Sequence, residues 1–204
     1  MSEKVLSRVN KEPGAGLQAV LAAQKGDRRA GPSRRPFGGP KTNPPQAEEV
    51  KAQCDTFVLD SFTADDAWEL GHLLYARLLP LVAQKGRPTL ISIASATGHV
   101  LFQAAVGAGT QLDNTIWIAR KRATVLRFGC STWLMHCKFA GDEEAFRAKY
   151  TLSPDLAAGY AIHGGGVPIR VRGCEGVAAV VVISGLKQHE DHGVIVDVIN
   201  ANWK

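Results

Sequence analysis

The apolar segment at residues 177–184 constrains the fold more than any other feature of the sequence. It reads Val-Ala-Ala-Val-Val-Val-Ile-Ser and does not alternate polar with apolar side chains. A strand of this composition is covered on both faces, so we expect it at the centre of a sheet. A second strand is predicted over 167–172, and the glycine-containing turn at 173–176 joins the two as a hairpin.

The rest of the chain predicts an α/β fold of the α+β type. Strands are expected over 56–59, 89–94 and 100–105, the last two as an antiparallel hairpin, and helices over 48–55, 63–85, 113–128, 142–150 and 188–199. Hairpins joined by helices predict an antiparallel central sheet flanked by helices, not a doubly wound nucleotide fold. No strand is followed by a G-x-G-x-x-G or G-x-x-x-x-G-K phosphate loop.

A run of three glycines just before the 167–172 strand is the best candidate for a binding site. Glycines allow positive φ and a close approach of another group, and their open N–H groups suit a carboxylate. A histidine precedes the run, and an arginine lies on the strand that follows. The ligand-binding residues predicted here are His163, Gly164, Gly165, Gly166 and Arg170. A purely structural tight turn is the alternative for the glycines, and a loop hydrogen bond is the alternative for His163.

Two further groups of residues are candidates for binding. Arg120 and Arg127 are seven residues apart on the 113–128 helix and share a face that suits an anionic ligand, with Trp117 one turn before Arg120. The alternatives are a solvated face for the arginines and core packing for the tryptophan. His189, Asp191 and His192 lie together at the start of the last helix, where they suit a metal ion. Favourable placement of acidic residues at a helix N-terminus is the alternative there.

Charge is distributed unevenly along the chain. Residues 1–46 carry nine Lys or Arg against three Asp or Glu, whereas the other 158 residues carry fifteen against sixteen. We therefore expect a flexible basic Gly/Pro-rich tail over 1–47 and one domain over 48–204. A short docking helix over 17–23, a mitochondrial targeting segment and contact with an anionic surface are alternatives for the tail. The near-neutral domain argues against specific nucleic-acid binding.

No apolar segment of the sequence is long enough to span a membrane, and the first residues lack a secretory signal. The four cysteines have no C-x-x-C spacing, and we interpret them as reduced thiols of a cytoplasmic protein. No nucleophile–base pair is readable. The sequence therefore predicts no catalytic residues and favours a binding protein over an enzyme.

Several motifs resemble the haem-degrading-domain family, the GlcG/HbpS-like proteins. They are His-Gly-Gly-Gly-Val-Pro-Ile at 163–169, Val-Ile-Ser-Gly-Leu at 182–186 and Glu-Asp-His at 190–192. Asp-Ala-Trp-Glu-Leu-Gly at 66–71 and Arg-Lys-Arg at 120–122 extend the resemblance to a branch of small, uncharacterised intracellular proteins. It covers about residues 56–200. The resemblance implies a profilin- or PAS-like sandwich, assembly into rings or larger homo-oligomers, and haem or a related tetrapyrrole as a cofactor of some members. It places no axial haem ligand on a residue of this chain.

Three hypotheses on function follow. The first is a homo-oligomeric small-ligand-binding protein that holds haem or another anionic cofactor at the glycine-rich loop. The second is an oligomeric adaptor without catalytic activity that presents its ends to protein partners such as chaperone-pathway components. An enzyme acting on a small carbonyl or tetrapyrrole compound is the third.

Overall fold

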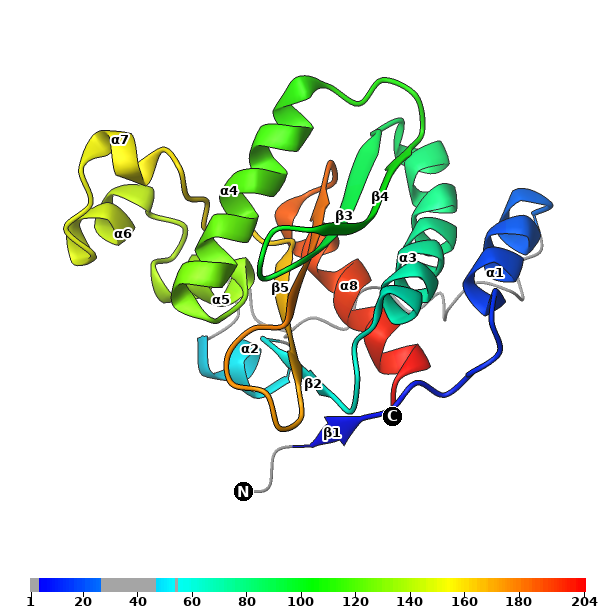
Figure 1. Ribbon diagram of the computed structural model, residues 1–204. Helices are drawn as coiled ribbons and strands as arrows, with labels where there is room; N and C mark the ends of the chain where they lie inside the picture. The colour runs from blue at the N-terminus through cyan, green and yellow to red at the C-terminus, as the bar shows by residue number, and fades with distance from the viewer. Residues whose placement is uncertain (1–3, 27–46, 54) are drawn as a thin grey trace.

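The computed structural model describes residues 4–26, 47–53 and 55–204. Its six-stranded sheet has the order β1-β2-β5-β6-β3-β4 (Figure 1). The strands are β1 (Val5–Leu6), β2 (Phe57–Leu59), β3 (Thr89–Ser95), β4 (Val100–Val106), β5 (Gly166–Val171) and β6 (Ala179–Ser184). The helices are α1 (Ala15–Gln24), α2 (Ala47–Gln53), α3 (Ala64–Lys85), α4 (Leu112–Phe128), α5 (Thr132–Lys138), α6 (Glu143–Lys149), α7 (Pro154–Ala157) and α8 (Gln188–Asn202).

The centre of the sheet is antiparallel, which confirms the predicted fold class. Strand β6 pairs with β5 on one side and with β3 on the other, and β3 pairs with β4, all antiparallel. Every residue of β6 is buried, as its unbroken apolar composition predicts. The short strands β2 and β1 add a parallel edge beside β5.

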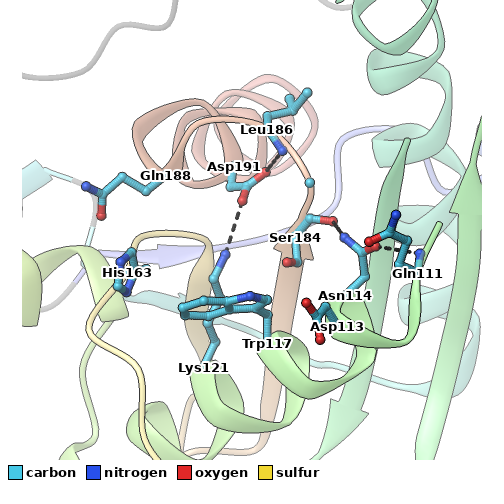
Figure 2. A pocket seen from close by; sticks show the side chains of 11 residues that line it. Gln111, Asp113, Asn114, Trp117, Lys121, His163, Ser184, Leu186, Gln188 and Asp191 are labelled. Atoms are coloured by element: carbon cyan, nitrogen blue, oxygen red, sulfur yellow. Dashed lines mark hydrogen bonds and ion pairs between the residues drawn. The ribbon is translucent and has the colours of Figure 1, made fainter. Parts of the chain in front are cut away.

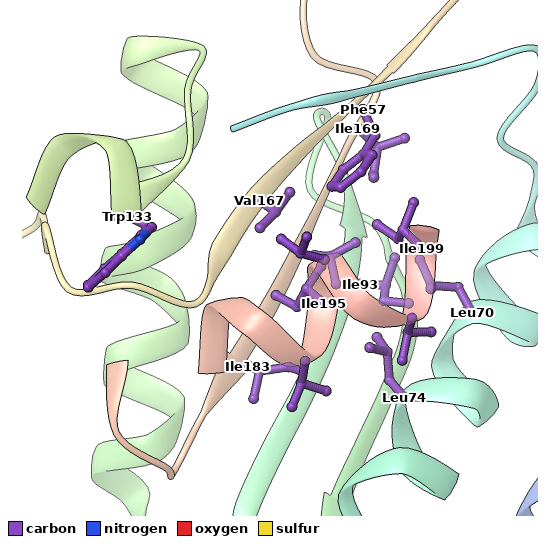
Figure 3. Close-up of a cluster of buried hydrophobic side chains, with 14 of the residues drawn as sticks. Phe57, Leu70, Leu74, Ile93, Trp133, Val167, Ile169, Ile183, Ile195 and Ile199 are labelled. Carbon is purple, nitrogen blue, oxygen red and sulfur yellow. The ribbon is translucent and has the colours of Figure 1, made fainter. Parts of the chain in front are cut away.

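Buried side chains form one cluster on each face of the sheet. Alternate residues of β3 and β6 point to opposite faces, so Ile183 belongs to one cluster and Val182 to the other. Helices α3 and α8 cover the larger cluster, which Figure 3 shows between them and the strands. Helix α4 covers the opposite face through Ile118 and Val125. The fold is therefore a sheet between two helical layers.

Capping residues set the helix ends where the sequence predicts them. The Thr63 side chain accepts a hydrogen bond from the N–H of Asp66 and begins α3, and Gly86, with φ 61°, ends it. Pro80 lies inside α3, which continues to Lys85. The Ser131 side chain accepts a hydrogen bond from the N–H of Leu134 and caps α5.

The N-terminal segment differs from the expected flexible tail over residues 4–26. Strand β1 pairs with β2, and α1 packs on α3. The Glu69 carboxylate of α3 accepts hydrogen bonds from the N–H groups of Gly14 and Gly16, at 2.5 and 2.6 Å. A carboxylate at the N-terminus of α1 is favourable because the helix dipole is positive there. The segment 17–23, for which a short docking helix was the alternative, lies within α1. Residues 27–46 are outside the described part of the chain.

The cysteines that the structure describes are free thiols, namely Cys130, Cys137 and Cys174. Burial raises the pKa of Cys130 and of Cys137 to about 11, so neither is an activated thiolate at neutral pH. Cys54 lies outside the described residues. Among the described helices, none is both long and apolar enough to cross a membrane.

Candidate functional site

A pocket of about 280 Å³ lies between α4 and the start of α8 (Figure 2). Its walls come from the first turns of α4, from the loop before β5 and from the turn that joins β6 to α8. The residues that line it are Gln111, Asp113, Asn114, Trp117, Lys121, His163, Ser184, Gly185, Leu186, Gln188 and Asp191. Three amides, a hydroxyl, an indole and an imidazole therefore face a single space.

The wall formed by α4 is positioned by Asn114. Its side-chain oxygen accepts a hydrogen bond from the N–H of Gln111 at 2.9 Å and so begins the helix. Its amide nitrogen donates to the carbonyl of Ser184, the last residue of β6, at 3.3 Å. From there Trp117 and Lys121 follow at helical spacing on the same side of α4. One residue therefore fixes both the start of α4 and its distance from the sheet.

The floor of the pocket is a buried ion pair. Lys121 Nζ lies 3.1 Å from Asp191 Oδ2 and also donates to the carbonyl of Ile183 at 2.9 Å. The Asp191 carboxylate accepts further hydrogen bonds from the N–H groups of Gly185 and Leu186. Burial raises the pKa of Asp191, and the Lys121 ammonium opposes that rise. The pair thus holds the β6–α8 turn against α4.

The three glycines are packed against this floor. A Cβ on Gly165 would lie 2.5 Å from the carbonyl oxygen of Ile183 and 2.7 Å from Lys121 Nζ, and its φ is 113°. The N–H of Gly166 donates to Thr132, and that of Gly164 to the side chain of Gln188. These contacts are internal to the fold. The structural alternative for the glycine run therefore accounts for the glycines, and of the run 163–166 only His163 lines the pocket.

His163 and Trp117 form the rim. Their rings meet edge to face with centroids 4.9 Å apart. On its other side, His163 Nδ1 lies 3.4 Å from Glu143 Oε1 of α6. Burial lowers the pKa of His163; Glu143 counters this effect, whereas the positive charges of Lys121 and Arg120 add to it. The imidazole is therefore neutral at neutral pH and able to accept a proton or a metal ion.

The predicted arginines do not line the pocket. Arg120 and Arg127 share a face, as expected, but Tyr160 occupies it: Arg120 donates to the Tyr160 carbonyl at 3.0 Å and Arg127 to its hydroxyl at 2.8 Å. Arg120 also lies over the Trp117 ring, 4.6 Å from its centroid. Arg170 donates to the carbonyl of Gly129. The expected anion-binding arginine face thus mainly serves internal contacts.

The predicted metal site at His189, Asp191 and His192 is not formed. Asp191 is engaged with Lys121, His189 is exposed, and His192 is buried near Trp133. Residues three apart share a helix face, but here one lies in the core and the other in solvent. Across the described ranges, no three His, Cys, Asp or Glu residues are grouped to hold a metal ion.

Several residues of the pocket were not predicted from the sequence, among them Asn114, Lys121, Ser184 and Gln188. Glu143, which contacts the rim residue His163 without lining the pocket, was not predicted either. A signal existed for α4, since Asn114, Trp117 and Lys121 are spaced for one helix face. Lys121 lies within the Arg-Lys-Arg run at 120–122, and such basic runs are usually solvated. Glu143 is 20 residues from His163, and no local pattern joins the two.

Comparison with known proteins decides the family. The model described as "Haem degrading protein HbpS-like" matches residues 62–200. This chain belongs to the HbpS-like family. The matched range contains every residue of the pocket and excludes the segment 4–26 that packs on the domain. The family expected from the sequence motifs is thereby confirmed.

Relatives and a solved structure agree with this assignment. The chain is 40% identical to a UPF0303 protein of Streptomyces avermitilis over 156 residues, covering 76% of this chain and 90% of that protein. It is 37% identical to UPF0303 protein YBR137W of Saccharomyces cerevisiae over 147 residues, covering 72% and 76%. The crystal structure of the Ybr137w protein matches with a TM-score of 0.64 at 34% identity, covering 76% of this chain and 84% of that chain. The domain that carries the pocket therefore shares the fold of the Ybr137w protein.

Proposed function

We propose that this HbpS-like chain is a small-ligand-binding protein whose ligand enters the pocket between α4 and α8. One observation carries the proposal: a partly exposed tryptophan–histidine rim stands above a fully buried lysine–aspartate floor, with amide side chains between them. Concave sites with an aromatic wall and a few converging polar groups are typical of ligand pockets.

The charges of the pocket define the class of ligand. Lys121 is neutralised by Asp191, and Asp113 is the other charged residue among the lining groups. Hydrogen-bonding side chains make up much of the remaining wall. The pocket therefore suits a polar group that both donates and accepts hydrogen bonds, such as an amide or a zwitterion, better than a bare anion.

Native mass spectrometry of the purified protein tests this proposal. We expect a co-purifying small molecule that is lost in Trp117→Ala, because the indole forms one wall of the pocket. Trp68→Ala is the matched control, since Trp68 is an exposed tryptophan on α3 outside the pocket. A bound mass that survives Trp117→Ala would place the ligand elsewhere. If the wild-type protein carries no small molecule, amides and amino acids are added and their binding is measured by thermal shift. Trp117→Ala and Trp68→Ala are then compared in the same way.

Haem is the second candidate, because the family description names it. A cavity of about 280 Å³ with a buried ion pair and several amide side chains in its walls does not enclose a whole tetrapyrrole, which needs a larger apolar slot. The rim fits better: His163 is neutral and 41% exposed, and it stands beside an aromatic ring. A haem bound by this chain would contact His163 and Trp117 at the rim, with the iron chemistry supplied by the cofactor.

Titration with haemin separates the two candidates. If the rim binds haem, the Soret band shifts saturably and the affinity falls about tenfold or more in His163→Ala, the loss expected for one contact of about 1.4 kcal/mol. His99→Ala is the control, because His99 is an exposed histidine at the β3–β4 turn. An absent shift, or the same shift in both variants, would exclude haem at this rim while leaving the polar-ligand proposal to its own test.

A further inference from the structure

Helix α4 carries an apolar stripe on the side that faces away from the sheet. We call it the outer stripe; it consists of Leu112, Ile116, Ala119, Ala123 and Leu126. Leu112 is 77% exposed and Ile116 48% exposed, and they are among the most exposed large apolar residues that the structure describes. The buried residues of α4, which include Ile118 and Val125, lie on a different side of the helix. The stripe is therefore no part of the core.

The spacing of the outer stripe is that of a helix–helix seam. Its residues follow one another at steps of four, three, four and three, which is the a/d pattern of a coiled coil. Single exposed apolar residues need no explanation, but five at this spacing form a continuous row. In the described residues, the elements packed on α4 are β6, β5, β3 and α5. They contact its other side, so the row has no partner within the described chain.

The order of side-chain sizes along the stripe is self-complementary. Leu112 and Ile116 lie at the N-terminal end of the stripe and Leu126 at its C-terminal end, with two alanines between them. If two such helices pack antiparallel about Ala119, Leu112 of one copy meets Leu126 of the other, and Ile116 meets the small Ala123. Alanines at the crossing point allow the close approach at which helices pack. An isologous dimer needs a surface that matches itself in this way.

The charges beside the stripe favour the same orientation. Asp113 is exposed in the first turn of α4, and Arg127 is exposed in the last turn. Antiparallel packing brings Asp113 of each copy next to Arg127 of the other. Parallel packing would instead place like charges together, which is unfavourable.

We propose that α4 packs antiparallel on α4 of a second copy of this chain through the outer stripe. The contact deepens the expected homo-oligomer by naming its surface, and it does not rest on the ligand proposal. The two are nevertheless connected, because the opposite side of α4 carries Trp117 and Lys121. A partner helix would brace the element that forms one wall of the pocket.

The mass of the protein in solution tests the surface. By light scattering after size exclusion, we expect the wild-type mass to be an even multiple of the chain mass. It falls about twofold or further in Ile116→Lys and in Ala119→Arg, since a charge in the seam opposes an isologous contact. Leu156→Lys on α7 is the control: Leu156 is 59% exposed and lies outside the stripe. Circular dichroism checks that each variant is folded. A monomeric wild type, or unchanged mass in both seam variants, would overturn the proposal.

Two further experiments test the orientation. In a Cys174→Ser background, Ala119→Cys is expected to form a disulfide-linked dimer under mild oxidation, because a residue at the two-fold axis meets its own copy. Ala105→Cys on β4, an exposed control, forms none. Asp113→Arg weakens the dimer, and the double variant Asp113→Arg/Arg127→Asp restores it. Loss of the cross-link together with no restoration would contradict antiparallel packing.

Discussion

Two pairs of an acidic and a basic side chain border the same pocket and differ in both burial and charge. On the floor, Lys121 Nζ and Asp191 Oδ2 are 3.1 Å apart, and their side chains are 4% and 3% exposed. At the rim, His163 Nδ1 and Glu143 Oε1 are 3.4 Å apart, with exposures of 41% and 50%. In the buried pair each charge is stabilised mainly by the other charge. In the rim pair, water also solvates both side chains and weakens their interaction. We therefore expect the floor pair to stabilise the fold and the rim pair to contact the ligand.

The largest effect is expected from breaking the floor pair. Lys121→Met leaves the Asp191 carboxylate buried without its counter-charge and should lower the free energy of unfolding by about 3–5 kcal/mol, measured by urea denaturation. Lys85→Met is the control, because the Lys85–Glu190 pair is partly exposed and should cost about 1 kcal/mol or less.

A double variant distinguishes an uncompensated charge from lost packing. Lys121→Met/Asp191→Asn should recover part of the stability, since an amide still accepts hydrogen bonds from the Gly185–Leu186 turn without carrying charge. No recovery, or equal losses in Lys121→Met and Lys85→Met, would contradict the distinction between a fully buried and a partly exposed ion pair.

A smaller loss of stability is expected from Gly165→Ala, whose added methyl group clashes with the floor pair. The new methyl group would meet the Ile183 carbonyl, Lys121 and Asp191, in a backbone conformation with φ 113°. Strain and overpacking together should lower the free energy of unfolding by about 2–4 kcal/mol. Gly173→Ala has φ 80° but open space, so strain alone should cost about 1–2 kcal/mol. Equal losses in both variants would show that the glycine run is not closely packed.

The smallest effect is expected at the rim, where only a pKa changes. Glu143 raises the pKa of His163, so Glu143→Gln should lower it further, as measured by NMR titration of the imidazole. Glu144→Gln is the matched control, since Glu144 pairs with Arg147. An unchanged His163 pKa in Glu143→Gln would show that the rim pair is not formed in solution.

The same shift gives a sign for the pH dependence. The pKa of His163 is lower in the folded protein than the ordinary value of 6.5. Between those two values the unfolded chain binds more protons, so the stability contributed by a neutral His163 is lost as the pH falls below about 6.5. His163→Gln should flatten this part of the stability profile.

Much of the fold could be predicted from the sequence because local patterns carry it. The apolar run at 177–184 required a central strand, Thr63 and Gly86 marked the ends of α3, and the family motifs gave the correct assignment. The site was less predictable. Of the residues proposed for ligand binding, the pocket gathers His163 and Trp117, while Asp191, proposed as a metal ligand, forms its floor.

The sequence by itself determined the strands, the helices, their caps and the family, since each depends on side chains close together in the chain. Tertiary structure alone decided that Lys121 is buried on Asp191, that the glycines serve packing and that Tyr160 occupies the arginine face. It also decided that residues 4–26 lie on the domain. These facts depend on contacts between groups that are far apart in the chain, and desolvation at those contacts sets the charge and the role of each group.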